Sequence, residues 1–233
     1  MSSPIETRPV IALKQAGVCY RLKRKIAGSN RYWALNEISL EVRKGETLGI
    51  LGSNGAGKST LMKLMAGIVA PDRGSAWRDP NEKITLLSLG VGFESNLTGR
   101  ENAILSALLL GLHRQTIDKR LDKIRDFSEL GEFFEQPVYT YSSGMMARLG
   151  FSVAMEVQPD VLLLDEVLSV GDHAFHEKSA QAIRGLMDSD RTVVLISHDM
   201  QTIRELCDRA VWVERGVTRA TGTVEEVAAL YLA

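Results

Sequence analysis

The sequence of 233 residues lacks three features that would place a chain outside the cell or inside a membrane. It has two cysteines, Cys19 and Cys207, each in an apolar run, so we expect reduced core cysteines of a cytosolic protein rather than a disulfide framework. Its longest apolar stretch, residues 103–112, contains Ser106 and is too short to cross a bilayer. The first eight residues have no apolar core, which excludes a signal peptide there.

An excess of charge of one sign is also lacking. The chain has 28 Lys and Arg against 29 Asp and Glu, a net charge of −1, which argues against bulk electrostatic binding to nucleic acid. It has no internal repeats and no low-complexity segment. With 45% hydrophobic and 24% charged residues, the composition is that of a globular protein with a substantial core.

What the sequence does have is a phosphate-binding loop that matches G-x-x-x-x-G-K-[ST] at every position. A strand-like run, residues 47–51, precedes it, and a helical pattern follows over 61–69. Inward-pointing backbone N–H groups and the helix dipole suit a polyphosphate, with Lys58 reaching the β- and γ-phosphates and Ser59 holding Mg²⁺. The loop predicts nucleoside triphosphate binding by Gly52, Ser53, Asn54, Gly55, Ala56, Gly57, Lys58, Ser59 and Thr60.

The order of the apolar runs predicts an α/β fold. Residues 161–164 and 192–196 are continuous apolar runs with a helical stretch between them, which is typical of a parallel sheet covered on both faces. Helical patterns dominate from 99 to 158. The other expected elements are strands at 11–20, 38–42, 83–89, 210–213 and 217–220, a turn at 71–74 and a closing helix at 224–232.

Polar residues follow two of these runs and would emerge at the ligand-binding edge of the sheet. Asp165 would contact Mg²⁺ and Glu166 would polarise the attacking water, although acidic residues at this point can also serve only to cap a helix. His198 could bind the γ-phosphate and position the water, or be structural. His173 and His176 have no evident third partner, so they do not predict a metal site.

A basic segment, residues 21–33, lies between the first two expected strands. Its charge allows two interpretations. It is either a solvated hairpin or a surface that faces anionic lipid head groups or a membrane partner.

The segment Tyr141–Leu149 places a serine and a glycine at the start of a helix, where anions bind and where Ser142 or Ser143 could also be a helix cap. Its Ser-Ser-Gly-Met-x-x-Arg pattern is similar to the signature sequence of ATP-binding-cassette (ABC) ATPases. The order of motifs also resembles that family: phosphate loop, signature, Asp165-Glu166 strand, Ser169-Val-Gly-Asp172 turn and Ser197-His198. The resemblance covers essentially the whole chain.

The resemblance implies one ABC ATPase domain over 1–233, with a parallel-sheet P-loop core at about 1–90 and 159–233, an antiparallel β subdomain and a helical signature subdomain at about 95–158. It also implies a head-to-tail homodimer, because the chain has one set of motifs. Each ATP, with its Mg²⁺, would lie between the phosphate loop of one copy and Ser143 and Gly144 of the other. An aromatic residue stacks on adenine in this family; Tyr20 has the usual position, with Tyr32 and Trp33 as alternatives.

Several segments resemble the ATPase subunits of bacterial polysaccharide exporters for O-antigen, capsule or teichoic acid: Trp33–Leu40, Leu89–Phe93, Leu97–Asn102, Tyr139–Gly144 and Asp165–Asp172. This resemblance implies a polytopic membrane permease as partner, a lipid-linked glycan as the transported substrate, no nucleic acid partner, and a peripheral location on the cytoplasmic face of the inner membrane. Some such exporters have a C-terminal carbohydrate-binding domain, which we do not expect in this sequence.

One departure from the wider family is the absence of glutamine between Ser59 and Arg100, where that family has a residue that touches Mg²⁺ and couples to the permease. The loop Leu89–Asn96 would then couple to the permease differently, with Ser88 and Glu94 as candidates for the missing residue. Two alternatives remain open: the ATPase subunit of an importer or drug exporter, and a soluble ABC ATPase acting on ribosomes or DNA. The second usually has two cassettes or a coiled-coil insertion, which this sequence lacks.

Overall fold

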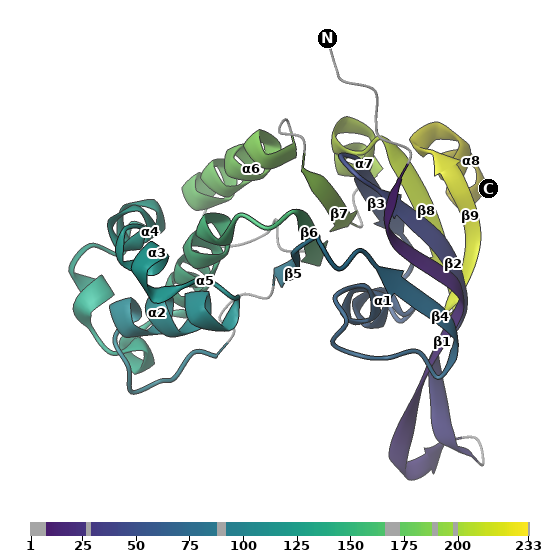
Figure 1. The fold of residues 1–233 in the computed structure, drawn as a ribbon, viewed down its shortest axis with the longest axis horizontal. Coiled ribbons are helices and arrows are strands. Elements are labelled where there is room, and N and C mark those ends of the chain that lie inside the picture. The colour runs from purple at the N-terminus through teal and green to yellow at the C-terminus, as the bar shows by residue number, and fades with distance from the viewer. Residues whose placement is uncertain are drawn as a thin grey trace. The chain divides into compact units, whose positions relative to one another are not determined.

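The computed structural model describes residues 8–26, 29–87, 92–165, 173–187, 191–197 and 200–232 (Figure 1). The chain forms two compact units, which are described separately below. The sheet unit comprises Met1–Leu86, Asp160–Glu166 and Met187–Ala233, and the helical unit comprises Leu87–Pro159 and Val167–Leu186.

The sheet unit is built on a mixed sheet with the strand order β4-β1-β2-β9-β8-β3-β7-β6-β5. Its strands are β1 (Pro9–Ile26), β2 (Ser29–Arg43), β3 (Thr47–Leu51), β4 (Arg73–Arg78), β5 (Ile84–Leu87), β6 (Val161–Asp165), β7 (Thr192–Ile196), β8 (Arg209–Glu214) and β9 (Val217–Thr223). The neighbours β8, β3, β7 and β6 run parallel, whereas β1 pairs antiparallel with β2 and β4. The mixed sheet and its helices confirm the α/β fold.

The central parallel strands β3 and β7 are buried along their length, and β6 is buried up to its last residue, as parallel strands covered on both faces are. Every residue of β3 and β7 is buried, and helix α1 (Lys58–Met65) covers the sheet with Leu61, Met62, Leu64 and Met65. Helices α7 (Met200–Leu206) and α8 (Val224–Leu232) complete the unit. A rigid, fully packed sheet therefore supports the loops that leave its carboxyl edge.

A buried ion pair fixes the start of β3. The Glu46 side chain is fully buried, and its two carboxylate oxygens accept hydrogen bonds from Arg209 Nη1 at 3.0 and 2.9 Å. The backbone N–H of Arg43 donates to the same carboxylate at 2.8 Å. Because every contact compensates for the lost hydration of the carboxylate, removing either partner leaves a buried charge unpaired.

The helical unit contains α2 (Gly99–Leu109), α3 (Arg114–Asp118), α4 (Leu121–Ser128), α5 (Ser143–Val157), α6 (His173–Met187) and the 3₁₀ turns η1 (Gly131–Glu135) and η2 (Val138–Thr140). Its core joins α2, α4 and α5 through buried apolar side chains that include Ala103, Ile124 and Leu149. Phe127, Phe151 and Phe175 form a second cluster with ring centroids 5.9 Å apart, which connects α4, α5 and α6. In the part of the chain that the structure describes, no helix is long and apolar enough to span a membrane.

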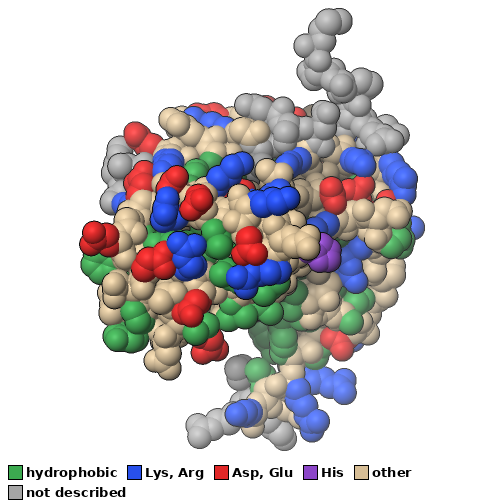
Figure 2. All heavy atoms as spheres, turned by 60° about the vertical axis from the view of Figure 1, so that its left-hand side comes forward, with side chains coloured by type: hydrophobic (Ala, Val, Ile, Leu, Met, Phe, Trp, Pro, Cys, Tyr) green, Lys and Arg blue, Asp and Glu red, His purple; other side chains and the backbone are tan. Residues whose placement is uncertain are grey.

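The structure differs from the sequence prediction at two places in the sheet unit. The edge strand β4 is not predicted, because its six residues have no clear alternation; it forms through antiparallel pairing with β1. The basic segment 21–33 belongs to a hairpin, as one of its two interpretations allowed, but its strands are longer than the predicted 11–20 and 38–42. Strand β1 extends to Ile26 and β2 begins at Ser29, and the hairpin projects beyond the other strands of its sheet (Figure 1). Lys and Arg side chains lie on the described part of this projection (Figure 2).

Candidate nucleotide-binding site

Three parallel strands bring the predicted site residues to one edge of the sheet. The register pairs Ile50 of β3 with Ile196 of β7, and Ile196 with Asp165 of β6. The phosphate loop follows β3 directly, and Ser197 follows β7. Ligands in open parallel sheets bind at this carboxyl edge, so the fold places the loop and Asp165 as the sequence predicts.

The phosphate loop has the backbone of an anion site. Gly57 adopts φ 103° at the start of α1, and a Cβ there would lie 2.5 Å from the Ala34 carbonyl oxygen, so both the conformation and the space require glycine. In the described part of the chain, no acceptor takes the backbone N–H of Gly55 or Gly57. Unpaired N–H groups at a helix N-terminus favour negative charge, which a phosphate would supply.

Lys58 is held inside this loop. Its side chain is 6% exposed, and Nζ donates to the carbonyl oxygens of Gly52 at 2.8 Å and Ser53 at 3.1 Å. The two carbonyl oxygens hold the ammonium group within the loop through these hydrogen bonds. A phosphate bound by the loop would therefore lie beside a buried, positively charged side chain.

A cavity of about 480 Å³ opens over the loop. Ser59 and Asp165 both line it, and they come from α1 and β6. A hydroxyl and a carboxylate are the hard oxygen ligands that Mg²⁺ prefers when phosphates and water complete its coordination. The donor set therefore fits a nucleotide-bound magnesium ion. The other lining residues are Tyr20, Tyr32, Ala34, Asn54, Gly55, Gly57, Lys58 and Thr60.

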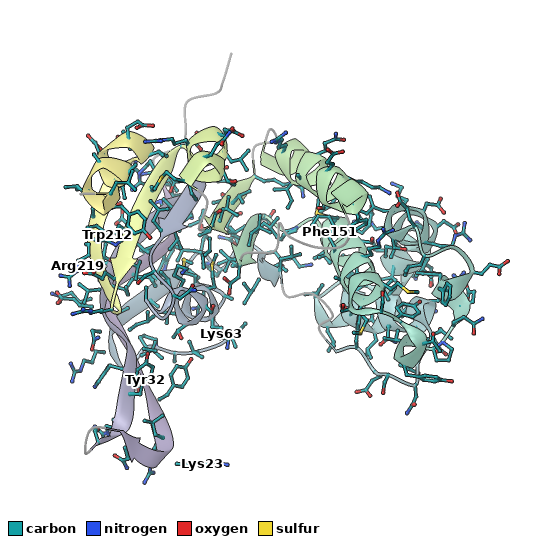
Figure 3. The ribbon with its side chains drawn as sticks, turned by 180° about the vertical axis from the view of Figure 1, so that it is seen from behind. Lys23, Tyr32, Lys63, Phe151, Trp212 and Arg219 are labelled. Atoms are coloured by element: carbon teal, nitrogen blue, oxygen red, sulfur yellow. The ribbon has the colours of Figure 1, made fainter. Side chains whose placement is uncertain are left out.

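Two tyrosines lie at the entrance of this cavity. Tyr20 of β1 and Tyr32 of β2 are directly opposite each other in the hairpin, and they are 37% and 48% exposed. Figure 3 labels Tyr32 on this hairpin. Trp33, the third candidate for adenine stacking, does not line the cavity. Its ring packs under Arg73, with the guanidinium carbon 3.9 Å from the ring centroid. Side chains alternate between the faces of a strand, which separates Tyr32 from Trp33.

Several expected site residues lie outside the described part of the chain. These are Glu166, His198 and Ser88, together with the turn that contains Ser169 and Asp172. Asp165 and Ser197 are the last described residues before Glu166 and His198. Glu94 is described and exposed, and its backbone N–H donates to the buried Asn102 Oδ1 at 2.7 Å.

The signature segment begins helix α5 in the helical unit. Ser142 is the N-cap, because its Oγ accepts a hydrogen bond from the Met145 backbone N–H at 3.2 Å. Ser143 is therefore not the cap; it is exposed, and its hydroxyl has no hydrogen-bond partner among the described residues. A Cβ on Gly144 would meet only Ser142 Oγ at 3.8 Å, which is ordinary contact. Neither Ser143 nor Gly144 is thus needed for the local structure.

Tyr32 lines the nucleotide cavity together with Tyr20, although from the sequence it was only an alternative to Tyr20 for stacking on adenine. Ala34 also lines the cavity, and the sequence did not indicate it. The strand alternation of residues 32–34 was the available signal, because it puts Tyr32 and Ala34 on one face and Trp33 on the other. Ala34 also gives the carbonyl that crowds Gly57, so β2 shapes the loop as well as the cavity wall.

Comparisons with known proteins agree with this geometry. The family model described as "ABC transporter" matches residues 35–169. The O-antigen export system ATP-binding protein RfbB of Klebsiella pneumoniae is 45% identical over 86% of this chain and 81% of its own length. The teichoic acids export ATP-binding protein TagH of Lactococcus lactis is 44% identical over 88% of this chain and 44% of its own length.

The fold is also that of a solved ATP-binding cassette. The dimeric structure of MJ0796 in a post-hydrolysis state with ADP and Pi superimposes with a TM-score of 0.75 at 21% identity, covering 92% of this chain and 98% of that one. At this identity the likeness shows the fold alone. Together with the family match and the geometry of the phosphate loop, it identifies this chain as an ATPase of the ABC transporter family.

Proposed function

We propose that this chain is the ATPase subunit of an exporter that moves a lipid-linked polysaccharide, such as O-antigen or capsule, across the bacterial inner membrane. The support is the similarity to RfbB and TagH, whose names assign them to O-antigen and teichoic acid export. Residues 1–233 form its ATPase domain. The partner is a polytopic permease that holds the chain at the cytoplasmic face of the membrane.

The catalytic unit is a head-to-tail homodimer. The observation that carries this proposal is the start of α5: Ser143 offers a hydroxyl without a partner among the described residues, and Gly144 has open space where a side chain would be. Both fit a phosphate that another copy brings. MJ0796, which has the same fold, is described as a dimer. A two-fold pair then has two equivalent composite sites.

Each residue of the site has a defined role. Lys58 and the N–H groups of the loop would bind the phosphates, Ser59 and Asp165 would hold Mg²⁺, and Tyr20 and Tyr32, which line the same cavity, would border the adenine. The bound ion would neutralise charge on the phosphates. Glu166 orients and polarises the attacking water, and His198 hydrogen-bonds the γ-phosphate. Catalysis is then mainly positioning and electrostatic stabilisation.

Mixing two inactive variants tests the composite site. Lys58→Ala removes the cation of the loop, and Gly144→Asp places a carboxylate against the phosphates, so each variant alone should have no turnover. A mixed pair has one doubly defective site and one intact site. Random pairing should restore roughly a quarter of wild-type ATPase activity, because half of the dimers are mixed and each has one intact site of two. Activity that stays absent after mixing would contradict the composite site.

The transported substrate needs a separate test. Tagged Glu166→Gln protein, which should bind ATP without turnover, would be isolated from native membranes with ATP in mild detergent. Mass spectrometry should find a multi-span permease and a prenyl-linked glycan. A substrate-binding importer component would replace the export assignment with the importer alternative and leave the ATPase chemistry unaffected. Recovery of ribosomes or DNA would favour the soluble alternative.

A further inference from the structure

The positive charge of the chain is concentrated in the β1–β2 hairpin. Between Thr7 and Asn36 there are seven Lys or Arg residues and no Asp or Glu, although the whole chain has a net charge of −1. The rest of the chain is therefore acidic. Five of the seven cations lie within residues 21–31 of β1 and β2, the end of the hairpin that projects in Figure 1: Arg21, Lys23, Arg24, Lys25 and Arg31. The side chains of Arg21, Lys23 and Arg31 are exposed, and Figure 3 labels Lys23.

The hairpin has a second hollow on the face opposite the nucleotide cavity. It has a volume of about 570 Å³, and Arg21, Arg31, Arg73 and Trp33 line it, whereas Tyr20 and Tyr32 line the nucleotide cavity. Asp72 is the acidic residue of the lining, and its Oδ2 accepts a hydrogen bond from the Cys19 backbone N–H at 2.7 Å. Three guanidinium groups thus face a single carboxylate.

Arg21 and Arg31 are an unfavourable pair for the fold alone. They are directly opposite in the antiparallel register, both are exposed, and in the described part of the chain neither has a salt bridge. Like charges in that position destabilise a hairpin. An external anion between them would remove the repulsion, because a guanidinium group binds phosphate through two parallel hydrogen bonds.

We propose that the end of the β1–β2 hairpin binds the phosphate groups of an anionic lipid surface. Lys23 is a further exposed cation of this hairpin and does not line the hollow, which suits a surface of many phosphates better than one small anion. Trp33 lines the same hollow as the arginines, and such amphipathic rings are enriched at the headgroup level of membranes. The contact is direct and goes beyond the proposed function, in which the permease alone holds the chain at the membrane.

Vesicle co-sedimentation of the purified wild-type protein tests this inference. Binding is expected to phosphatidylcholine vesicles that contain phosphatidylglycerol and not to phosphatidylcholine alone, and it should weaken as salt is raised. Arg21→Gln with Arg31→Gln should weaken binding roughly 25-fold, about fivefold for each charge removed. The matched control, Lys119→Gln with Lys123→Gln, removes two exposed charges of the helical unit and should bind like wild type.

A second variant separates lipid binding from folding. Arg31→Glu turns the like-charge pair into an opposite-charge pair with Arg21, so the melting temperature should rise slightly while vesicle binding falls. Equal losses in the hairpin and control variants, or binding to neutral vesicles, would overturn the proposal. So would specific competition by inorganic phosphate at constant ionic strength, which would indicate a single-phosphate site instead.

The outcome is independent of the proposed function. ATPase recovery in the mixed-variant experiment is measured with purified protein in solution and does not involve a lipid surface. Failure of vesicle binding with successful recovery would therefore reject the hairpin inference alone, whereas the reverse result would reject the composite site alone.

Discussion

The phosphate loop and the signature segment are both glycine-containing helix N-termini, yet their own chain supports them in different ways. In the loop, Gly57 is required by its φ of 103° and by the Ala34 carbonyl, and Lys58 is buried among backbone oxygens. In the signature, Ser143 is exposed and Gly144 has open space around it. The loop is shaped by packing within the chain, whereas nothing in the described part of the chain requires Ser143 or Gly144, a difference that the proposed composite site would explain.

The largest effect on the fold is expected from Gly57→Ala. The new methyl group would lie 2.5 Å from the Ala34 carbonyl oxygen in a conformation that disfavours a side chain. We expect a loss of about 3 kcal/mol in the free energy of unfolding and no measurable nucleotide binding. Urea unfolding and fluorescent-nucleotide titration would measure both. A stable variant that still binds ATP would show that the loop is not constrained by β2.

Gly99→Ala tests whether the helical unit also has a glycine whose surroundings leave no space for a side chain, as at Gly57 of the phosphate loop. A Cβ at Gly99 would lie 2.1 Å from Tyr141 Oη, and that hydroxyl is itself fixed by a 2.6 Å hydrogen bond to the Phe133 carbonyl oxygen. We expect a loss of about 2 kcal/mol in unfolding free energy. Nucleotide binding to the phosphate loop should not change. A neutral result would mean that Tyr141 moves aside without cost.

The sequence predicted the phosphate loop well because its parts are contiguous. Gly52 to Thr60 lie between one strand and one helix, so a local pattern specifies the whole loop. Asp165 was predicted because a buried parallel strand ends at that residue. Both predictions depend on local order along the chain and not on distant contacts.

The features that the sequence could not predict depend on pairing between distant strands. Tyr20 and Tyr32 share the cavity only because β1 and β2 continue through the basic segment, and their register brings the two rings opposite each other. Strand β4 forms on β1 without a periodic signal of its own. The choice of Ser142 over Ser143 as N-cap was open as well, because either side chain could have capped α5.

Tyr141→Phe should cost about 1 kcal/mol, since it removes the hydrogen bond to the Phe133 carbonyl while Gln136 still donates to that oxygen. Burial, and then the negative charge of Glu135, raises the pKa of Tyr141 from 10.0 to about 12. Between these values the native state binds more protons than the unfolded state, so stability falls as pH rises from 10 to 12. In urea unfolding measured at increasing pH, Tyr141→Phe should therefore show a smaller loss of unfolding free energy between pH 10 and 12 than wild type.

Cys207 provides the matching measurement in the sheet unit. Burial, and then the negative charge of Asp208, raises the pKa of its thiol from 9.0 to about 12. The stability that this thiol contributes should therefore begin to fall near pH 9, below the pH at which the contribution of Tyr141 begins to fall. Cys207→Ala should remove this earlier part of the decline. Identical alkaline profiles for wild type and both variants would show that neither group governs the pH dependence.

Ser142→Ala and Ser143→Ala compare neighbouring hydroxyl groups. The first removes the N-cap of α5 and should cost about 1 kcal/mol of unfolding free energy. The second removes a hydroxyl without a partner among the described residues and should stay within about 0.5 kcal/mol of wild type, while ATP turnover falls roughly 100-fold. Equal stability losses would mean that the two hydroxyls share the cap.

The smallest effect on the fold is expected from Gly144→Ala. A helix favours alanine over glycine, and nothing blocks the methyl group, so unfolding free energy should stay constant or rise by up to about 1 kcal/mol. Turnover should nevertheless fall at least about tenfold, because the methyl group takes the space of the partner copy's ATP. Gly185→Ala is the matched control: it adds a methyl group to α6 with nothing nearby, and should stabilise the chain without changing turnover. Full activity in both variants would remove the argument that the space at Gly144 belongs to a nucleotide.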